Sequence, residues 1–314
     1  MNYKIAIVGY GSIARRHLRN LKKVFLNRNV SGTVDLIRSG KGLPIEEEMR
    51  SLVHYVYTIE EEIEDDYDII FITNPTSLHY ETIKRYLQKT KHMFIEKPVF
   101  HTVDIDYDAL DWKENGIYYV ACPMRYHKAI RYLREHLDLQ KVYSVRTICS
   151  SYLPEWRPES DYRQSYSAKR QLGGGVSIDL IHEWDYLIDL FGYPKKVLHA
   201  QGKYSDLEIE TEDLSVYIGC YSDKIIELHL DYFGRKSMRR MEIFMQDETV
   251  VVDLLEGKVS YEKSGQLVSF EKDRDDYQMR ELEDFFDMIE GKKQNTNSMQ
   301  HAYEVLKLVT QEGE

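Results

Sequence analysis

The sequence predicts an α/β protein in which a doubly wound parallel sheet is followed by an α+β domain with a large, mostly antiparallel, open-faced sheet. Apolar runs at 3–8, 34–39, 67–75 and 92–98 alternate with helical patterns, which is typical of βα units. After residue 190 the chain changes to short alternating segments joined by polar turns. The length of 314 residues suits two domains, because single cores usually divide beyond about 250–300 residues.

We place the domain boundary at 121/122, giving domains 1–121 and 122–314, with the last helix a candidate to pack back on the first domain. The first domain should contain helices at 12–25, 78–90 and 102–115. In the second, a helix at 127–138 and a long strand at 142–153 should precede a helix within 173–187. Strands are then expected within 197–205, 214–222, 224–233, 239–246 and 249–256, and helices at 275–290 and 298–311.

Composition excludes several classes of function. The net charge of −11 disfavours a nucleic-acid partner. The three cysteines (Cys122, Cys149 and Cys220) form no C-x-x-C pair, which argues against a zinc site or a disulfide framework, so no metal is expected. No signal-peptide pattern and no run of about 18 apolar residues is present, so we expect a cytoplasmic protein without a membrane partner.

The segment GYGSIA directly follows the first apolar run and opens a helical stretch, as the G-x-G-x-x-G/A dinucleotide-binding fingerprint requires. Gly9 would permit the tight turn, Gly11 would let the backbone approach a pyrophosphate, and Ala14 would keep helix and strand close. With Ser12 and Ile13, these residues would bring phosphates to the positive end of the helix. Because glycine turns are common, a plain strand-to-helix connection is the alternative.

The end of the second predicted strand bears on which dinucleotide binds. A cofactor with a free ribose 2′-hydroxyl would favour an acidic residue there, but the chain has Arg38, Ser39 and Lys41. Two cations and a hydroxyl suit a 2′-phosphate, so NADP is favoured over NAD; a solvated basic loop is the alternative. Asp35 lies inside the strand, three residues too early for the ribose role.

Two further segments carry acid–base groups. Glu96-Lys97-Pro98 ends a strand, where ligands of open α/β sheets bind, so Lys97 could orient a hydroxyl or exchange its proton. In GGGVSIDLIHEWD, 173–185, helical spacing would place Asp179, His182 and Tyr186 on one face. An Asp one turn from a His can hold the imidazole, whereas a capped, partly buried His is the alternative. The three glycines suggest that some group approaches this backbone closely.

With these motifs, the sequence resembles the Gfo/Idh/MocA oxidoreductases, which act mostly on sugars and cyclitols with nicotinamide cofactors. The resemblance covers nearly the whole chain and rests on GYGSIA, TNPTSLH (73–79), EKP, ACPMRYH (121–127) and GGGVSIDLIHEWD, in this order. It implies that Lys97 is the catalytic lysine and that Asp179 and His182 face the substrate, His182 accepting the proton. Further cofactor-binding residues expected from it are Thr73, Asn74, Pro75, Thr76, His79, Glu96 and Lys97 itself.

Arg125 matches the arginine of the family's N-x-R-F stretch, although Pro123 replaces the asparagine. The segment 152–172 is rich in aromatic and cationic residues and precedes the GGG turn, so it is a candidate substrate lid rather than a plain exposed loop. Family members with similar loops suggest an acidic or nucleotide-linked sugar. The residues expected to bind substrate are Arg125, Tyr152, Trp156, Arg157, Tyr162, Arg163, Asp179 and His182. The resemblance also implies a homodimer or homotetramer through the open sheet face.

The expected reaction is hydride transfer between a nicotinamide and a secondary hydroxyl or ketone of a sugar or sugar derivative. His182 would take the hydroxyl proton, Asp179 would orient His182, and Lys97 would stabilise the developing alkoxide. Two alternatives remain open at this point. One is an NAD-dependent glycoside hydrolase of the same fold, which would retain its reduced cofactor, and the other is a non-catalytic regulator that senses NADP and a sugar.

Overall fold

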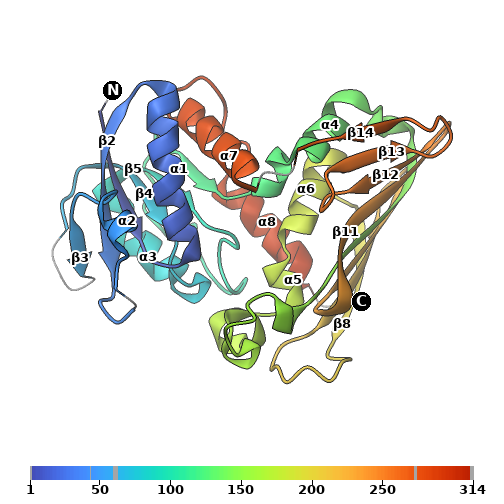
Figure 1. The fold of residues 1–314 in the computed structure, drawn as a ribbon, viewed down its shortest axis with the longest axis horizontal. Coiled ribbons are helices and arrows are strands. Elements are labelled where there is room, and N and C mark those ends of the chain that lie inside the picture. Colours follow the sequence, from blue (N-terminus) through green and yellow to red (C-terminus); the bar gives the residue numbers. More distant parts are fainter. Residues whose placement is uncertain (1, 43, 59–62, 272–273, 312–314) are drawn as a thin grey trace. The chain divides into compact units, whose positions relative to one another are not determined.

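A computed structural model describes residues 2–42, 44–58, 63–271 and 274–311 (Figure 1). Contacts within the chain divide it into two compact units, Met1–Ala121 with Gln278–Tyr303, and Cys122–Tyr277 with Glu304–Glu314. Residues 278–303 are therefore grouped with the N-terminal part of the chain. Whether the division at 121/122 separates two independently folding domains remains a prediction.

In the described part of the chain, the first unit holds a six-stranded sheet in the order β3-β2-β1-β4-β5-β6, with every pair parallel. The order reverses direction at β1, which is the doubly wound arrangement of a Rossmann domain. The central strands are apolar and almost fully buried because helices cover both faces. The strands are β1 (Asn2–Val8), β2 (Ser31–Arg38), β3 (Val56–Thr58), β4 (Tyr67–Ile72), β5 (Thr90–Ile95) and β6 (Tyr118–Val120).

Helices α1 (Ser12–Arg28), α2 (Glu47–Arg50) and α3 (His79–Tyr86) lie between these strands, and α3 is shorter than the predicted helix 78–90 because a 3₁₀ turn replaces its end. The helix predicted at 102–115 is absent. Side chains there bond the local backbone, as Asp106 does with Ala109 N, and such bonds compete with a helix. From the C-terminal segment, Phe285 of α7 (Arg274–Ile289) packs on Phe94 with ring centroids 5.3 Å apart.

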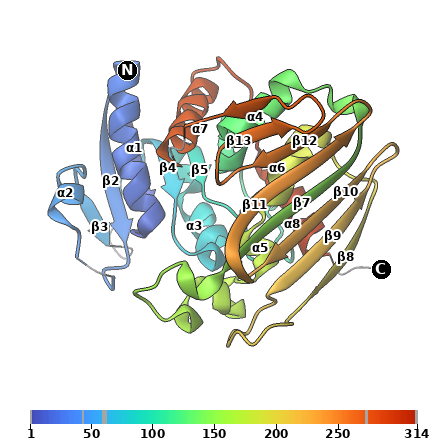
Figure 2. The ribbon, with the colours of Figure 1, turned by 45° about the vertical axis from the view of Figure 1, so that its right-hand side comes forward.

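The second unit is built on an eight-stranded sheet in the described residues, in the order β14-β13-β12-β11-β7-β10-β9-β8. Figure 2 shows most of these strands side by side. The sheet is antiparallel except for the parallel pair β7–β10, which confirms the predicted mostly antiparallel sheet. Its strands are β7 (Val142–Tyr152), β8 (Lys196–Gly202), β9 (Leu214–Cys220), β10 (Ile225–Asp231), β11 (Phe233–Met245), β12 (Thr249–Asp253), β13 (Lys258–Tyr261) and β14 (Leu267–Ser269).

One face of this sheet is covered and the other is open. Along β10 and β12 buried and more exposed residues alternate, as a half-covered sheet requires. Helix α6 (His182–Phe191) covers the buried face, where Trp184 meets Tyr217 edge to face at 5.7 Å. The other helices of the second part of the chain are α4 (Lys128–His136), α5 (Val176–Asp179) and α8 (Met299–Thr310). Over the described residues, we find no helix with the length and apolar character needed to cross a bilayer.

Candidate functional site

The glycine turn after β1 forms a cradle at the carboxyl edge of the parallel sheet. Gly9 adopts φ +104°, and its N–H donates to Ile37 O at 2.8 Å. A Cβ on Gly9 would lie 2.8 Å from Asn74 N, so a side chain is excluded there. Around Gly11 a Cβ would meet no atom of the described residues within 4 Å, and the first turn of α1 carries no acidic residue. The helix N-terminus is therefore open to an anion such as a pyrophosphate.

Residues 73–79 follow β4 and lie next to the glycine turn. Thr73 Oγ1 donates to Val8 O at 2.9 Å, and Asn74 Nδ2 donates to Thr82 Oγ1 at 2.7 Å. His79 is buried, and its two ring nitrogens lie 3.0 and 3.1 Å from the carbonyl oxygens of Asn74 and Val99. Burial lowers the pKa of His79. Its imidazole thus joins two backbone segments, whereas Pro75 is exposed and Thr76 is buried.

The Glu96-Lys97-Pro98 segment follows β5 as predicted. Glu96 Oε1 lies 2.7 Å from Nε2 of the buried His17 on α1, so this carboxylate fixes the segment to the helix that starts at the glycine turn. The Lys97–Pro98 peptide is cis. Lys97 is partly exposed at the same edge as Gly9 and Gly11.

Charged and aromatic side chains form a cluster around Arg38, the last residue of β2. The Arg38 guanidinium lies 5.4 Å from the ring centre of Tyr10, and Arg15 lies 5.8 Å from it. Glu46 accepts from the Tyr10 hydroxyl and from Arg15 Nη1, the latter at 2.5 Å, and these bonds lower the pKa of Glu46 to about 2, Tyr10 contributing most. Tyr10 and Glu46 were not among the predicted residues, because their contact joins positions 36 apart in the chain.

Beyond Arg38, the loop after β2 carries the two other residues expected near the ribose, Ser39 and Lys41. Ser39 and Lys41 are exposed, and Lys41 N donates to Ser39 Oγ at 3.4 Å. Asp35 is buried in β2, where it accepts from Tyr67 OH at 2.7 Å and Tyr55 N at 3.0 Å. Its carboxylate therefore serves the packing of the sheet.

In the second unit, the chain itself makes the close approach that the three glycines suggested. A Cβ on Gly174 would lie 2.2 Å from Tyr166 O, and one on Gly175, with φ +125°, would lie 2.3 Å from Glu212 Oε1. Burial raises the pKa of Glu212, which accepts from Ser177 N at 3.3 Å. The glycines let residues 166–167 and Glu212 pack against this turn.

The helix predicted behind the glycines is interrupted. It ends as α5 at Asp179, turns through Leu180 and Ile181, and resumes as α6 at His182. The single helical face predicted for Asp179, His182 and Tyr186 is therefore interrupted after Asp179, and only His182 and Tyr186 lie on the same helix. Tyr186 is fully buried and donates to Glu183 Oε2 at 2.7 Å.

Asp179 and His182 each have partners from distant segments. Asp179 Oδ2 accepts from Ser167 Oγ at 2.5 Å and from Tyr232 OH at 3.0 Å. His182 Nε2 lies against Arg239 Nη2 and 3.5 Å from Glu183 Oε1. None of Ser167, Tyr232, Glu183 and Arg239 was among the predicted site residues. The signal available in the sequence was the glutamate that directly follows the histidine in HEWD.

Arg125 is engaged inside the second unit. Its Nε and Nη2 donate to the two Asp185 oxygens at 2.8 and 2.6 Å, and its Nη1 lies 3.6 Å from Asp189 Oδ1. Burial alone would lower the pKa of Arg125, but Asp185 raises it well above its usual value. This bidentate pair joins the ACPMRYH segment to α6. Asp185 is itself buried.

The predicted lid, 152–172, is a series of short turns. Arg163 is exposed and pairs with Asp161 Oδ1 at 2.9 Å and Glu208 Oε2 at 2.8 Å, and Tyr162 OH accepts from Glu208 N at 3.2 Å. Arg157 is exposed.

Aromatic surface remains at the start of the lid. The guanidinium of Arg235 stacks 3.8 Å from the centre of the Tyr152 ring. Trp156 is 39% exposed, and its ring stands edge to face on Tyr232, the partner of Asp179, at 5.4 Å.

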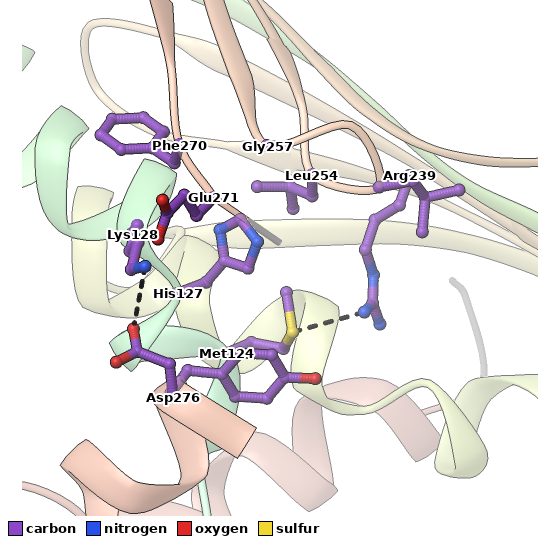
Figure 3. A pocket seen from close by; sticks show the side chains of 11 residues that line it. Met124, His127, Lys128, Arg239, Leu254, Gly257, Phe270, Glu271 and Asp276 are labelled. Atoms are coloured by element: carbon purple, nitrogen blue, oxygen red, sulfur yellow. Dashed lines mark hydrogen bonds and ion pairs between the residues drawn. The ribbon is translucent and has the colours of Figure 1, made fainter. Parts of the chain in front are cut away.

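A cavity of about 170 Å³ in the second unit borders the Arg239 side chain (Figure 3). Met124 Sδ lies 3.3 Å from Arg239 Nη1, and on the opposite side Lys128 Nζ lies 3.5 Å from Asp276 Oδ2. Burial, reinforced by Arg239, lowers the pKa of His127 in its wall to about 4, so this imidazole is neutral at pH 7. Across the ranges that the structure describes, no group of three His, Cys, Asp or Glu is arranged to hold a metal ion.

Comparison with known proteins agrees with this geometry. Residues 3–115 match the model of the oxidoreductase family GFO_IDH_MocA, described as an NAD-binding Rossmann fold. The parallel sheet and the glycine turn are those of a Rossmann-type dinucleotide-binding fold. Residues 3–115 are thus similar to the Gfo/Idh/MocA oxidoreductases, the family that the sequence motifs resemble.

Two curated relatives match parts of the chain. A D-xylose dehydrogenase of Paenarthrobacter nicotinovorans is 28% identical over 41% of this chain and 35% of its own length. An inositol 2-dehydrogenase/D-chiro-inositol 3-dehydrogenase of Lacticaseibacillus casei is 22% identical over 59% of this chain and 52% of its own length. The matched segments thus span about a third to a half of these relatives.

Solved structures resemble the chain over almost its whole length. UDP-N-acetylglucosamine 3-dehydrogenase from Acidithiobacillus ferrooxidans has a TM-score of 0.74 at 19% identity, covering 98% of this chain and 96% of that one. A levoglucosan dehydrogenase in complex with NADH has a TM-score of 0.82 at 16% identity, covering 98% and 95%. At these identities the likeness establishes the fold.

Proposed function

We propose that the protein is an NAD(P)-dependent oxidoreductase that transfers a hydride between the nicotinamide and a secondary hydroxyl or ketone of a sugar or sugar derivative. The observation that carries this proposal is the open N-terminus of α1 behind the Gly9–Gly11 turn, in the segment that matches the family model. Relatives named as xylose and inositol dehydrogenases support the class of reaction. The nicotinamide supplies the hydride chemistry when the cofactor is bound.

The chain's own acid–base groups in this proposal are Lys97 and His182, which share the hydrogen bonding and proton exchange at the substrate oxygen. Lys97 lies at the carboxyl edge of the parallel sheet, where such folds bind ligands. Behind the glycine turn, Asp179 is the last residue of α5 and His182 is the first residue of α6. Both side chains are partly exposed.

We propose NADP as the preferred cofactor. Arg38, Ser39 and Lys41 follow β2, the position from which side chains reach the ribose 2′ substituent. The aromatic ring of Tyr10, 5.4 Å from the Arg38 guanidinium, adds a flat surface beside these cations. Glu46 pairs with Arg15 in the same cluster.

We propose an acidic or nucleotide-linked sugar as the substrate class. Trp156 and Tyr152 offer aromatic surface, and the stacked Arg235 adds a cation beside them, a combination that suits a sugar ring with an anionic substituent. Arg163 is paired with Asp161 and Glu208, and Arg125 is paired with Asp185. Each arginine would therefore bind the substrate while it also contacts these carboxylates.

One experiment tests the reaction and the cofactor together. Purified full-length protein is assayed with NADP⁺ and NAD⁺ against nucleotide sugars, inositols and nonulosonic acids, following reduced cofactor by absorbance. Lys97→Ala and His182→Ala should each lower turnover at least ~100-fold, while calorimetry shows unchanged NADPH binding that is tighter than NADH binding.

Lys91→Ala is the matched control, because Lys91 lies on β5, the strand that precedes Lys97, and pairs with Asp68 at 2.6 Å on the surface. Wild-type turnover in both active-site variants would overturn the assignment of these residues. Hydrolysis of a glycosidic bond without release of reduced cofactor would replace the dehydrogenase by a hydrolase.

A further inference from the structure

The contact between His182 and Arg239 defines which ring nitrogen of His182 carries a proton. Arg239 Nη2 faces His182 Nε2 directly. A guanidinium has five N–H donors and no acceptor, so in this contact the histidine nitrogen must accept. A neutral imidazole has a single N–H, which then lies on Nδ1.

Arg239 is held in place by a carboxylate with no exposure to solvent. Glu183 Oε1 accepts from Arg239 Nε at 2.7 Å and lies 2.5 Å from Nη2, and Oε2 accepts from Tyr186 OH at 2.7 Å. Glu183 has 0% and Arg239 18% side-chain exposure. Separating a buried pair of this kind leaves an uncompensated charge, so the guanidinium is not available to swing away.

We propose that the buried Glu183–Arg239 pair is a positioning device that keeps His182 neutral, with its proton on Nδ1. This rests on the proposed function and refines it. His182 then offers the substrate oxygen a hydrogen bond from Nδ1–H and is not the group that accepts the hydroxyl proton. With a bound nicotinamide as the acceptor of the C–H electron pair, the O–H proton of the alcohol would pass to Lys97 Nζ.

The charged and titratable groups around His182 in its own unit are consistent with this role. Glu183 on α6 and Arg239 on β11 form the pair, and Asp179 precedes the turn into α6. Burial, followed by the charge of Glu183, raises the pKa of Cys149 on β7 to about 12, and burial raises the pKa of Tyr186. Both groups therefore stay neutral, and Arg239 is the cation that meets the imidazole.

The test reads the tautomer directly and needs no substrate. Full-length protein with ¹⁵N-labelled histidine is examined by long-range ¹H–¹⁵N NMR from pH 8 to 5.5, and the His182 signals are assigned by their loss in His182→Gln. The wild type should show the Nδ1–H form throughout. An Nε2–H form, or an imidazolium that appears at about the ordinary pKa of 6.5, would overturn the proposal.

A double variant tests the cause without leaving a buried charge unpaired. In Glu183→Gln/Arg239→Met both charges are removed, and His182 should lose the fixed tautomer and titrate near about pH 6.5. The matched control is Glu242→Gln/Arg240→Met, which removes the neighbouring pair, 3.0 Å apart, on the open face of the same strand and should leave the His182 signals unchanged. An unchanged tautomer in a folded Glu183/Arg239 double variant would overturn the role of the pair.

Where turnover is measurable, the double variant should also gain an acid limb in the pH profile of kcat/KM near about 6.5 that the wild type lacks. If instead the protein has no dehydrogenase activity, the proposed function fails while the NMR result still decides the tautomer. The two outcomes are therefore distinguishable.

Discussion

At the scale of single residues, the hydroxyl of Tyr232 links the fold of the second unit to a predicted acid of the site. The ring is fully buried, and its O–H donates to Asp179 Oδ2 at 3.0 Å. We expect Tyr232→Phe to destabilise the protein by about 1.5 kcal/mol, since a buried hydrogen bond to a charged group is lost. We also expect turnover to fall about 10-fold, because Asp179 is then less firmly placed.

Tyr217→Phe is the matched control for Tyr232→Phe. Tyr217 is equally buried, and its hydroxyl donates to the backbone oxygen of Val309 at 2.9 Å, away from Asp179. The loss of stability in urea unfolding should be similar, about 1 kcal/mol, with turnover unchanged. Equal kcat values for Tyr232→Phe and Tyr217→Phe would show that the role of Tyr232 is purely structural.

The motifs in the sequence predicted which residues are candidates but not what holds them. Asp179 meets Tyr232, 53 positions further along the chain, and His182 meets Arg239, 57 positions further. Such pairs depend on the register of β11 and on the loop before the glycines, neither of which local patterns encode. A motif reports a local backbone shape, whereas the partners of its side chains come from tertiary packing.

At the scale of elements, long periodic segments were predicted well, and the errors occurred where tertiary contacts replace local preference. The strands with buried apolar runs and the helix after GYGSIA agree with the sequence. The helix predicted at 102–115 is absent, and Tyr107 of this segment packs on Tyr303 at 4.8 Å. In the GGG helix the turn at Leu180 and Ile181 was not predictable, because both residues suit a helix interior.

The open face of the large sheet is the surface through which we propose that copies of this chain associate. Leu198 on β8 lies opposite Ile218 on β9, and Ile225 on β10 is near them, each 38–39% exposed. Beside this apolar area, Arg146 lies 3.5 Å from Glu242 and 3.9 Å from Glu227. An apolar patch with paired charges suits a self-complementary interface between two copies.

Ile218→Asp should therefore convert an oligomer to monomers, because it places a charge at the centre of the apolar patch. Light scattering after size-exclusion chromatography at micromolar concentration measures the mass. Leu267→Asp on β14 is the control, since Leu267 is 60% exposed at the opposite edge of the sheet and should leave the mass unchanged. A wild-type protein that is already monomeric would refute the association.

At the scale of the whole molecule, the chain returns from the second unit to complete the first. Residues 278–303 belong to the unit that begins the chain, and Arg28 at the end of α1 binds three carboxylates of this segment. Its contacts are Glu283 Oε2 at 3.1 Å, Asp287 Oδ1 at 3.0 Å and Glu290 Oε2 at 2.7 Å. Tyr3 OH also donates to Glu290 Oε1 at 2.9 Å. From the sequence, only the last helix was a candidate for such a return.

This return makes the stability of the first unit depend on pH through Glu290. Burial opposes ionisation, but the bonds from Lys292, Arg28 and Tyr3 lower the pKa of Glu290 to about 2 from its ordinary 4.5. Because the folded value is the lower one, the stabilisation is present above about pH 4.5 and is lost as the pH falls towards 2. With solvent screening of a partly hydrated network we expect this stabilisation to be on the order of 1 kcal/mol at pH 7.

Glu290→Gln should therefore have a lower free energy of unfolding in urea than wild type at pH 7, and this difference should narrow between pH 4.5 and 3. Glu135→Gln, which affects an exposed pair with Arg131 at 3.4 Å, should show no comparable gap at either pH. A gap for Glu290→Gln that stays constant down to pH 3 would mean that the carboxylate's charge is not what joins the returning segment to α1.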